Sequence, residues 1–114
     1  MRAHLAISCC CLALAATLYP TFDATAATVV VTQKGRAFVP SQIKIMVGDT
    51  ITFRNDDVVP HHVVSHTPLF PFDLDLEQPG QERSQTFTQA GQVIVGCDLH
   101  SSMEVVVDVV KAAQ

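Results

Sequence analysis

The fold class of this chain is decided by residues 42–55, which read Gln42-Ile43-Lys44-Ile45-Met46-Val47-Gly48-Asp49-Thr50-Ile51-Thr52-Phe53-Arg54-Asn55. Apolar and polar side chains alternate on both sides of Gly48-Asp49, and alternation with a period of two is typical of a half-buried β-strand. A glycine followed by an aspartate is typical of a turn. The stretch therefore predicts two short strands joined by a turn.

Other segments of the chain carry the same kind of pattern. Those that are rich in β-branched residues or that alternate in polarity are residues 28–33, 61–66, 81–88, 92–96 and 103–110. Residues 72–77 also alternate, but Pro68, Pro71 and Pro79 argue against a central strand, so we expect an edge strand or a covering loop there. Seven or eight short strands with turn signals between them predict an all-β fold, either a sandwich or a barrel.

The first 27 residues have the layout of a secretory signal peptide. Residues 5–18 are almost entirely apolar, and small residues follow at 23–27, where a signal peptidase would cut. The apolar stretch is shorter than the roughly 20 residues that a membrane-spanning helix needs. We therefore expect residues 1–27 to be removed on export to a bacterial periplasm, and residues 28–114 to form one domain without membrane insertion. A lipid anchor at Cys9 is a weaker alternative.

The charge of the chain limits the partners it can have. The 114 residues include seven Lys or Arg and eleven Asp or Glu, for a net charge of −4. No basic stripe of the kind that binds a nucleic-acid backbone is present in the sequence, so we expect no nucleic-acid partner. Mild acidity promotes solubility and weakly favours a basic partner. We expect the protein to be a monomer.

Cys97 is the one cysteine outside the predicted signal peptide. A lone cysteine in an exported protein cannot form an internal disulfide, so it is a reactive thiol, a metal ligand or a small buried apolar residue. His100 and Met103 follow it at intervals of three residues. Two histidines, one cysteine and a weak axial methionine are the ligands of blue-copper electron-transfer sites. The loop therefore favours a copper site over the other two interpretations.

The second histidine of such a site must come from another part of the chain. If residues 92–96 and 105–110 are neighbouring antiparallel strands, the loop between them lies at one end of the sandwich, where rigid strands can position it. His61 and His62 follow Pro60 at the start of another strand. Adjacent residues of a strand face opposite sides, so only one of the two should reach the metal. The pattern alone leaves both open.

Several motifs of the sequence, taken together, resemble those of a known family. The motifs that carry the resemblance are Phe38-Val39-Pro40, the stretch 43–55, Pro60-His61-His62-Val63-Val64, Pro79-Gly80-Gln81 and Cys97-Asp98-Leu99-His100-Ser101-Ser102-Met103. Residues 38–110 are similar to a cupredoxin of the plastocyanin and amicyanin kind, and the spacing of the last motif resembles amicyanin. The resemblance implies a Greek-key β-sandwich with one type 1 copper ion. It also implies that His61, Cys97, His100 and Met103 are the ligands, because the family's first ligand directly follows the proline.

The chain departs from the family pattern beside the expected ligands. His62 stands where the family has an asparagine that braces the ligand loop, and Asp98 follows the cysteine. We hypothesise that His62 donates a hydrogen bond to Asp98 or to the backbone beside it, because such bonds orient metal ligands. Gly96 stands where the family often has an aromatic residue.

The resemblance implies a small electron carrier rather than an enzyme. Its partners would be redox proteins, such as a dehydrogenase or a cytochrome. His100 is the expected electron port, and Leu99, Ser101 and Pro60 would form the docking surface around it. An alternative is a periplasmic copper carrier or chaperone that uses the same ligands. An enzyme with a thiolate–imidazole pair of Cys97 and His100 is less favoured, because it leaves the other expected ligands without a role.

Overall fold

The computed structural model describes residues 15–20 and 25–112, and that part of the chain is all-β. Its nine strands are β1 (Thr28–Lys34), β2 (Ala37–Val39), β3 (Gln42–Met46), β4 (Thr50–Asn55), β5 (His61–Ser65), β6 (Phe72–Glu77), β7 (Glu82–Thr86), β8 (Gly91–Cys97) and β9 (His100–Val110). Among these residues, no helix is long and apolar enough to cross a membrane. The predicted all-β class is confirmed, with one strand more than expected.

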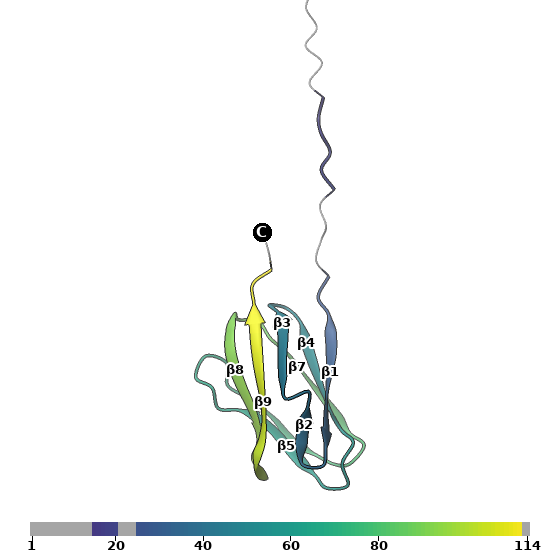
Figure 1. The fold of residues 1–114 in the computed structure, drawn as a ribbon, viewed down its shortest axis with the longest axis vertical. Coiled ribbons are helices and arrows are strands. Elements are labelled where there is room, and N and C mark those ends of the chain that lie inside the picture. Colours follow the sequence, from purple (N-terminus) through teal and green to yellow (C-terminus); the bar gives the residue numbers. More distant parts are fainter. Residues whose placement is uncertain (1–14, 21–24, 113–114) are drawn as a thin grey trace, which may run out of the picture.

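The strands form the two layers of a sandwich (Figure 1). One sheet has the order β2-β1-β4-β7, and the other has the order β3-β9-β8-β5-β6. Two pairs, β1 with β4 and β3 with β9, are parallel, and the other pairs are antiparallel. The turn at Gly48-Asp49 therefore takes the chain from one sheet to the other, because β3 and β4 belong to different layers.

Side chains that alternate along the strands fill the space between the sheets. The buried apolar residues are Val31, Phe38, Ile45, Ile51, Phe53, Val63, Phe87, Val93, Val95, Cys97, Met103, Val105, Val107 and Val109. Phe87 is fully buried, stacks on Phe70 at a ring separation of 5.3 Å and meets Phe72 edge-on at 5.8 Å. Along the strands, buried residues alternate with more exposed ones, as the alternation of apolar and polar residues in the sequence predicted.

One strand was not expected, and one expectation that had two alternatives is resolved. The sequence analysis missed β2, which has only three residues and is too short to show a period. Residues 72–77 form β6, the edge strand next to β5, so the first of the two alternatives is correct. The three prolines that argued against a central strand all lie outside β6.

The hairpin of β8 and β9 determines where the candidate ligands lie. The two strands are antiparallel neighbours, as expected, and Cys97 is paired with His100 across a register irregularity. Only Asp98 and Leu99 lie between the strands. Met103 is therefore within β9 and not on a loop, and its side chain belongs to the buried face of that strand.

Candidate metal centre

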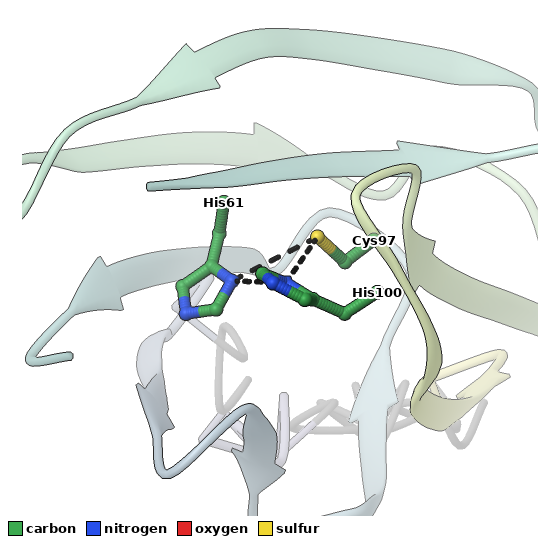
Figure 2. A group of neighbouring side chains, drawn as sticks. All are labelled: His61, Cys97 and His100. Atoms are coloured by element: carbon green, nitrogen blue, oxygen red, sulfur yellow. Dashed lines mark hydrogen bonds between the residues drawn. The ribbon is translucent and has the colours of Figure 1, made fainter. Parts of the chain in front are cut away.

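Three possible metal ligands meet at one end of the sandwich. His61 is the first residue of β5, Cys97 is the last residue of β8, and His100 is the first residue of β9. Figure 2 shows the two imidazoles and the thiol converging. Nδ1 of His61 lies 3.2 Å from Nδ1 of His100, and Sγ of Cys97 lies 3.8 Å from each of these nitrogens. Three strand ends thus hold three donor atoms around one point.

The site is largely closed to solvent. His61 is fully buried, Cys97 and Met103 are buried, and His100 is partly exposed. Met103 follows His100 by three residues on β9 and faces the interior. A thioether and a thiolate suit copper, and imidazoles suit copper, zinc and other transition metals. Zinc sites use cysteine, histidine and carboxylate ligands, so a buried methionine beside the cluster favours copper.

The structure brings His61, and not His62, together with Cys97 and His100. The imidazole of His62 lies on the other side of β5, where its Nε2 is hydrogen-bonded to the carboxylate of Asp73 on β6. Asp75 lies close to that pair. The opposite orientation of the two histidines follows from the alternation of side chains along a strand.

The backbone of His62, rather than its side chain, braces the hairpin. The N–H of His62 donates to Sγ of Cys97 over 3.3 Å, and its carbonyl accepts from the N–H of Asp98 over 3.0 Å. The prediction that the His62 imidazole donates a hydrogen bond to Asp98 or to the backbone beside it is therefore wrong. The carboxylate of Asp98 is bonded instead to Nε2 of His66 over 3.1 Å.

Asp57 is a residue beside the cluster that the sequence analysis missed. Its Oδ2 lies 3.1 Å from Nε2 of His61, on the opposite side of that ring from Cys97. The N–H of Arg36 donates to the same oxygen over 2.7 Å and is the main cause that lowers the pKa of Asp57 to about 2. The carboxylate is therefore ionised at neutral pH. Asp57 lies in an irregular loop, so no periodicity in the sequence pointed to it.

Residues that neighbour His61 and His100 in the sequence differ in their exposure to solvent. Leu99, which precedes His100, is 48% exposed, and Pro60, which precedes His61, is half-buried. Ser101 is exposed. Val58, two residues before Pro60, is 87% exposed. The side chain of His100 is partly exposed to solvent, and an electron port requires such exposure.

Comparison with known proteins agrees with this geometry. The family of copper binding proteins described as the plastocyanin/azurin family matches residues 25–110. A chloroplastic plastocyanin of Silene latifolia subsp. alba is 36% identical over 78 residues, which are 59% of this chain and 47% of that protein. The chain thus spans about half the length of this relative. A plastocyanin of Solanum crispum is 32% identical over 77 residues, which are 58% of this chain and 78% of that protein.

Solved structures share the fold. The Cu(I) form of an amicyanin variant has a TM-score of 0.67 and 26% identity, covering 72% of this chain and 81% of its own. A Cu-containing nitrite reductase from Thermus scotoductus SA-01 has a TM-score of 0.69 and 25% identity, but this chain corresponds to only 25% of that one. With a family match over residues 25–110 and a donor set that fits copper, the chain belongs to the plastocyanin/azurin family of copper-binding proteins.

Proposed function

We propose that this protein carries single electrons between redox partners, using copper bound by His61, Cys97, His100 and Met103. The observation that carries the proposal is the convergence of the donor atoms of His61, Cys97 and His100 within 3.8 Å of one another, in a buried site that reaches the surface at one imidazole. Copper, when bound, supplies one-electron exchange between its Cu(I) and Cu(II) states.

The protein contributes a site in which little has to move. Cys97 binds as a thiolate, and the N–H of His62 donates to its sulfur, which stabilises the negative charge. His61 lies between Asp57 and the other members of the cluster, with one ring nitrogen near each. Ligands held in this way by strand ends and hydrogen bonds would have little freedom to rearrange when copper changes its oxidation state, which would favour fast electron exchange.

The partly exposed imidazole of His100 connects the site to the surface. Leu99 precedes His100, and Val58 and Pro60 lie in the loop before His61; these apolar side chains, of which Leu99 and Val58 are exposed, would offer a docking surface to a redox protein, such as a dehydrogenase or a cytochrome. A small apolar contact suits a short-lived electron-transfer complex, because such encounters bury little surface. The resemblance to plastocyanin and amicyanin supports a carrier rather than an enzyme.

The burial of the ligands weighs against a copper carrier or chaperone. Such a protein has to release its metal to a recipient, and open ligands make exchange easier. Here His61 is fully buried, and Cys97 and Met103 are buried as well. We therefore favour electron transfer over copper delivery.

We also propose that the mature protein is periplasmic and monomeric. The support is the signal-like composition of residues 1–27, followed by the domain at 28–114. Residues 1–14 and 21–24 of that segment lie outside the described residues. Mass spectrometry of the exported protein would test cleavage after Ala26 or Ala27.

The visible spectrum of the purified protein with Cu(II) tests the proposed function. An intense charge-transfer band from thiolate to copper is expected, together with a reversible one-electron couple in voltammetry. Cys97→Ser should abolish the band, whereas Ser102→Ala, an exposed change on the same hairpin, should leave it unchanged. A wild-type protein without the band, or a Cys97→Ser variant that retains it, would overturn the proposal.

A further inference from the structure

We infer that Asp57 is the residue that positions His61 for metal binding, by holding Nε2 of the imidazole so that Nδ1 faces Cys97 and His100. The inference rests on the proposed function, because it concerns how a proposed copper ligand is prepared. It adds a residue that no pattern in the sequence and no family motif quoted above assigned to the site.

The two nitrogens of His61 have different neighbours. Nδ1 lies 3.2 Å from Nδ1 of His100 and 3.8 Å from Sγ of Cys97, whereas Nε2 lies 3.1 Å from Oδ2 of Asp57. A neutral imidazole carries one N–H, and an ionised carboxylate can only accept a hydrogen bond. The proton therefore belongs on Nε2, where it is donated to Asp57. The lone pair of Nδ1 is then free and points into the cluster.

Asp57 is itself fixed on several sides. Its Oδ2 accepts from the N–H of Arg36 over 2.7 Å, and its own N–H donates to Oδ1 of Asn55 over 2.9 Å. Asn55 is fully buried, and its Nδ2 donates to the carbonyls of Val59 and Glu77. The side chain of Asp57 is only 10% exposed. The carboxylate is therefore part of a built network and not a mobile surface charge.

The turn between β1 and β2 presents the N–H that holds Asp57. Gly35 and Arg36 both have left-handed backbones, with φ values of 60° and 55°. Two left-handed residues in a two-residue loop are typical of a type I′ hairpin, which favours glycine or asparagine. Arginine rarely adopts such a backbone, so Arg36 is strained there. The strained residue is the one whose N–H donates to Asp57, which ties this turn to the ligand His61.

The negative charge of Asp57 should change both the metal affinity and the reduction potential of the site. An anionic acceptor on Nε2 makes Nδ1 a stronger donor, and partners of this kind are worth on the order of 10- to 100-fold in metal affinity. A stronger donor favours Cu(II) over Cu(I). Asp57 should therefore lower the reduction potential and raise the affinity of the site for a divalent metal.

The experiment compares Asp57→Asn with Asp56→Asn in the full chain. The two changes remove the same charge from adjacent residues, but Asp56 is 40% exposed and pairs with Arg54 over 3.1 Å. We expect Asp57→Asn to raise the reduction potential clearly more than Asp56→Asn does. We also expect it to weaken Co²⁺ binding to the protein by on the order of 10-fold or more, measured by competition with a chromophoric chelator.

The nitrogen resonances of His61 provide a measurement that requires neither copper nor a variant. In the metal-free wild-type protein, ¹⁵N NMR should show the proton of His61 on Nε2. A proton on Nδ1 would overturn the inference even if both variants failed to fold. A wild-type protein without a charge-transfer band would refute the proposed function, whereas this NMR result would stand separately.

Two outcomes of the variant comparison would also overturn the inference. Equal shifts in reduction potential for Asp57→Asn and Asp56→Asn would mean that both shifts come from the long-range electrostatic effect of removing a charge. A loss of stability in metal-free Asp57→Asn, with unchanged potential, Co²⁺ affinity and His61 resonances, would show a role confined to the loop.

Discussion

Gln33 and Glu77 share a side-chain hydrogen bond in the interior of the sandwich, where Nε2 of Gln33 donates to Oε1 of Glu77 over 3.0 Å. Both residues are fully buried, and among the described residues neither Oε1 of Gln33 nor Oε2 of Glu77 has a partner. A proton on Oε2 of Glu77 would satisfy both atoms, because it can be donated to Oε1 of Gln33 and close a ring of two hydrogen bonds. Burial raises the pKa of Glu77 to about 7, in agreement with a protonated carboxyl.

This pair should make the stability of the protein depend on pH. The unfolded chain loses the Glu77 proton near its ordinary pKa of 4.5, whereas the folded chain keeps it up to about pH 7. The contribution of Glu77 to the free energy of unfolding should therefore fall as pH rises through this range, by about 1.4 kcal/mol per pH unit. Urea unfolding of the metal-free protein at several pH values would measure it. A contribution that rises with pH would contradict the protonated pair.

The variant Glu77→Gln isolates this contribution from those of other titrating groups. An amide at position 77 can donate to Oε1 of Gln33 and accept from its Nε2, so both hydrogen bonds persist without a titrating proton. We expect the variant to be at least as stable as the wild type at pH 7.5. The difference in stability between the two proteins should change steeply between pH 4.5 and 7. Parallel pH profiles would show that Glu77 does not titrate in this range.

Removal of copper should leave the sandwich folded. The core extends through both sheets, and the hydrogen bonds of His61 with Asp57 and of the His62 N–H with Cys97 join protein groups to one another. Amide resonances of the chelator-treated protein should remain well dispersed. Copper should then raise stability by mass action, by about 2.7 kcal/mol at a free metal concentration 100-fold above Kd. Collapse of the dispersion on chelation would show that the metal is needed for folding.

Two glycines of β8 should respond differently to alanine. Gly91 has φ of 140°, and a Cβ there would lie 2.3 Å from Cδ2 of Leu69. Gly91→Ala should therefore destabilise the protein by about 1–3 kcal/mol. A Cβ on Gly96 would meet nothing closer than the carbonyl oxygen of Met103 at 3.5 Å, so Gly96→Ala should be neutral or stabilising by up to about 1 kcal/mol. Thermal unfolding of both variants checks the contrast, and equal effects would contradict it.

The cluster of Phe87 with Phe70 and Phe72 should contribute strongly to stability. Phe87 is fully buried, so Phe87→Ala should lower the free energy of unfolding by about 3–5 kcal/mol. Phe72 is only half-buried, and Phe72→Ala should cost clearly less. Chemical denaturation of the two variants measures the difference. A larger effect at Phe72 would contradict the assignment of Phe87 to the centre of the cluster.

The sequence predicted the strands well because most of them show alternation within a single segment. Residues 42–55 became β3 and β4 with the expected turn, and β8 and β9 are neighbours as expected. The pattern could not show that β3 and β4 lie in different sheets, because that depends on pairing with β9 and β1, which are distant in the sequence. The strand β2 was missed because its three residues are too few to show a period.

The metal-binding chemistry of the candidate site could be predicted from the sequence. The residues that hydrogen-bond to the site histidines could be predicted less well. The spacing of Cys97, His100 and Met103 in the sequence indicates a metal site, and the family resemblance singles out His61. The partner of the His62 imidazole was predicted wrongly, because the edge strand carrying Asp73 was uncertain from the sequence. Asp57 was missed because its contact with His61 depends on the path of an irregular loop.

The location of β9 imposes an order of assembly. This strand is the last to be synthesised in the domain, yet it lies between β3 and β8 inside its sheet. During synthesis or export, the emerging chain therefore exposes an unpaired edge on β3 until β9 arrives. Because β9 also carries His100 and Met103, two of the proposed copper ligands, the full proposed set comes together only after this strand has paired.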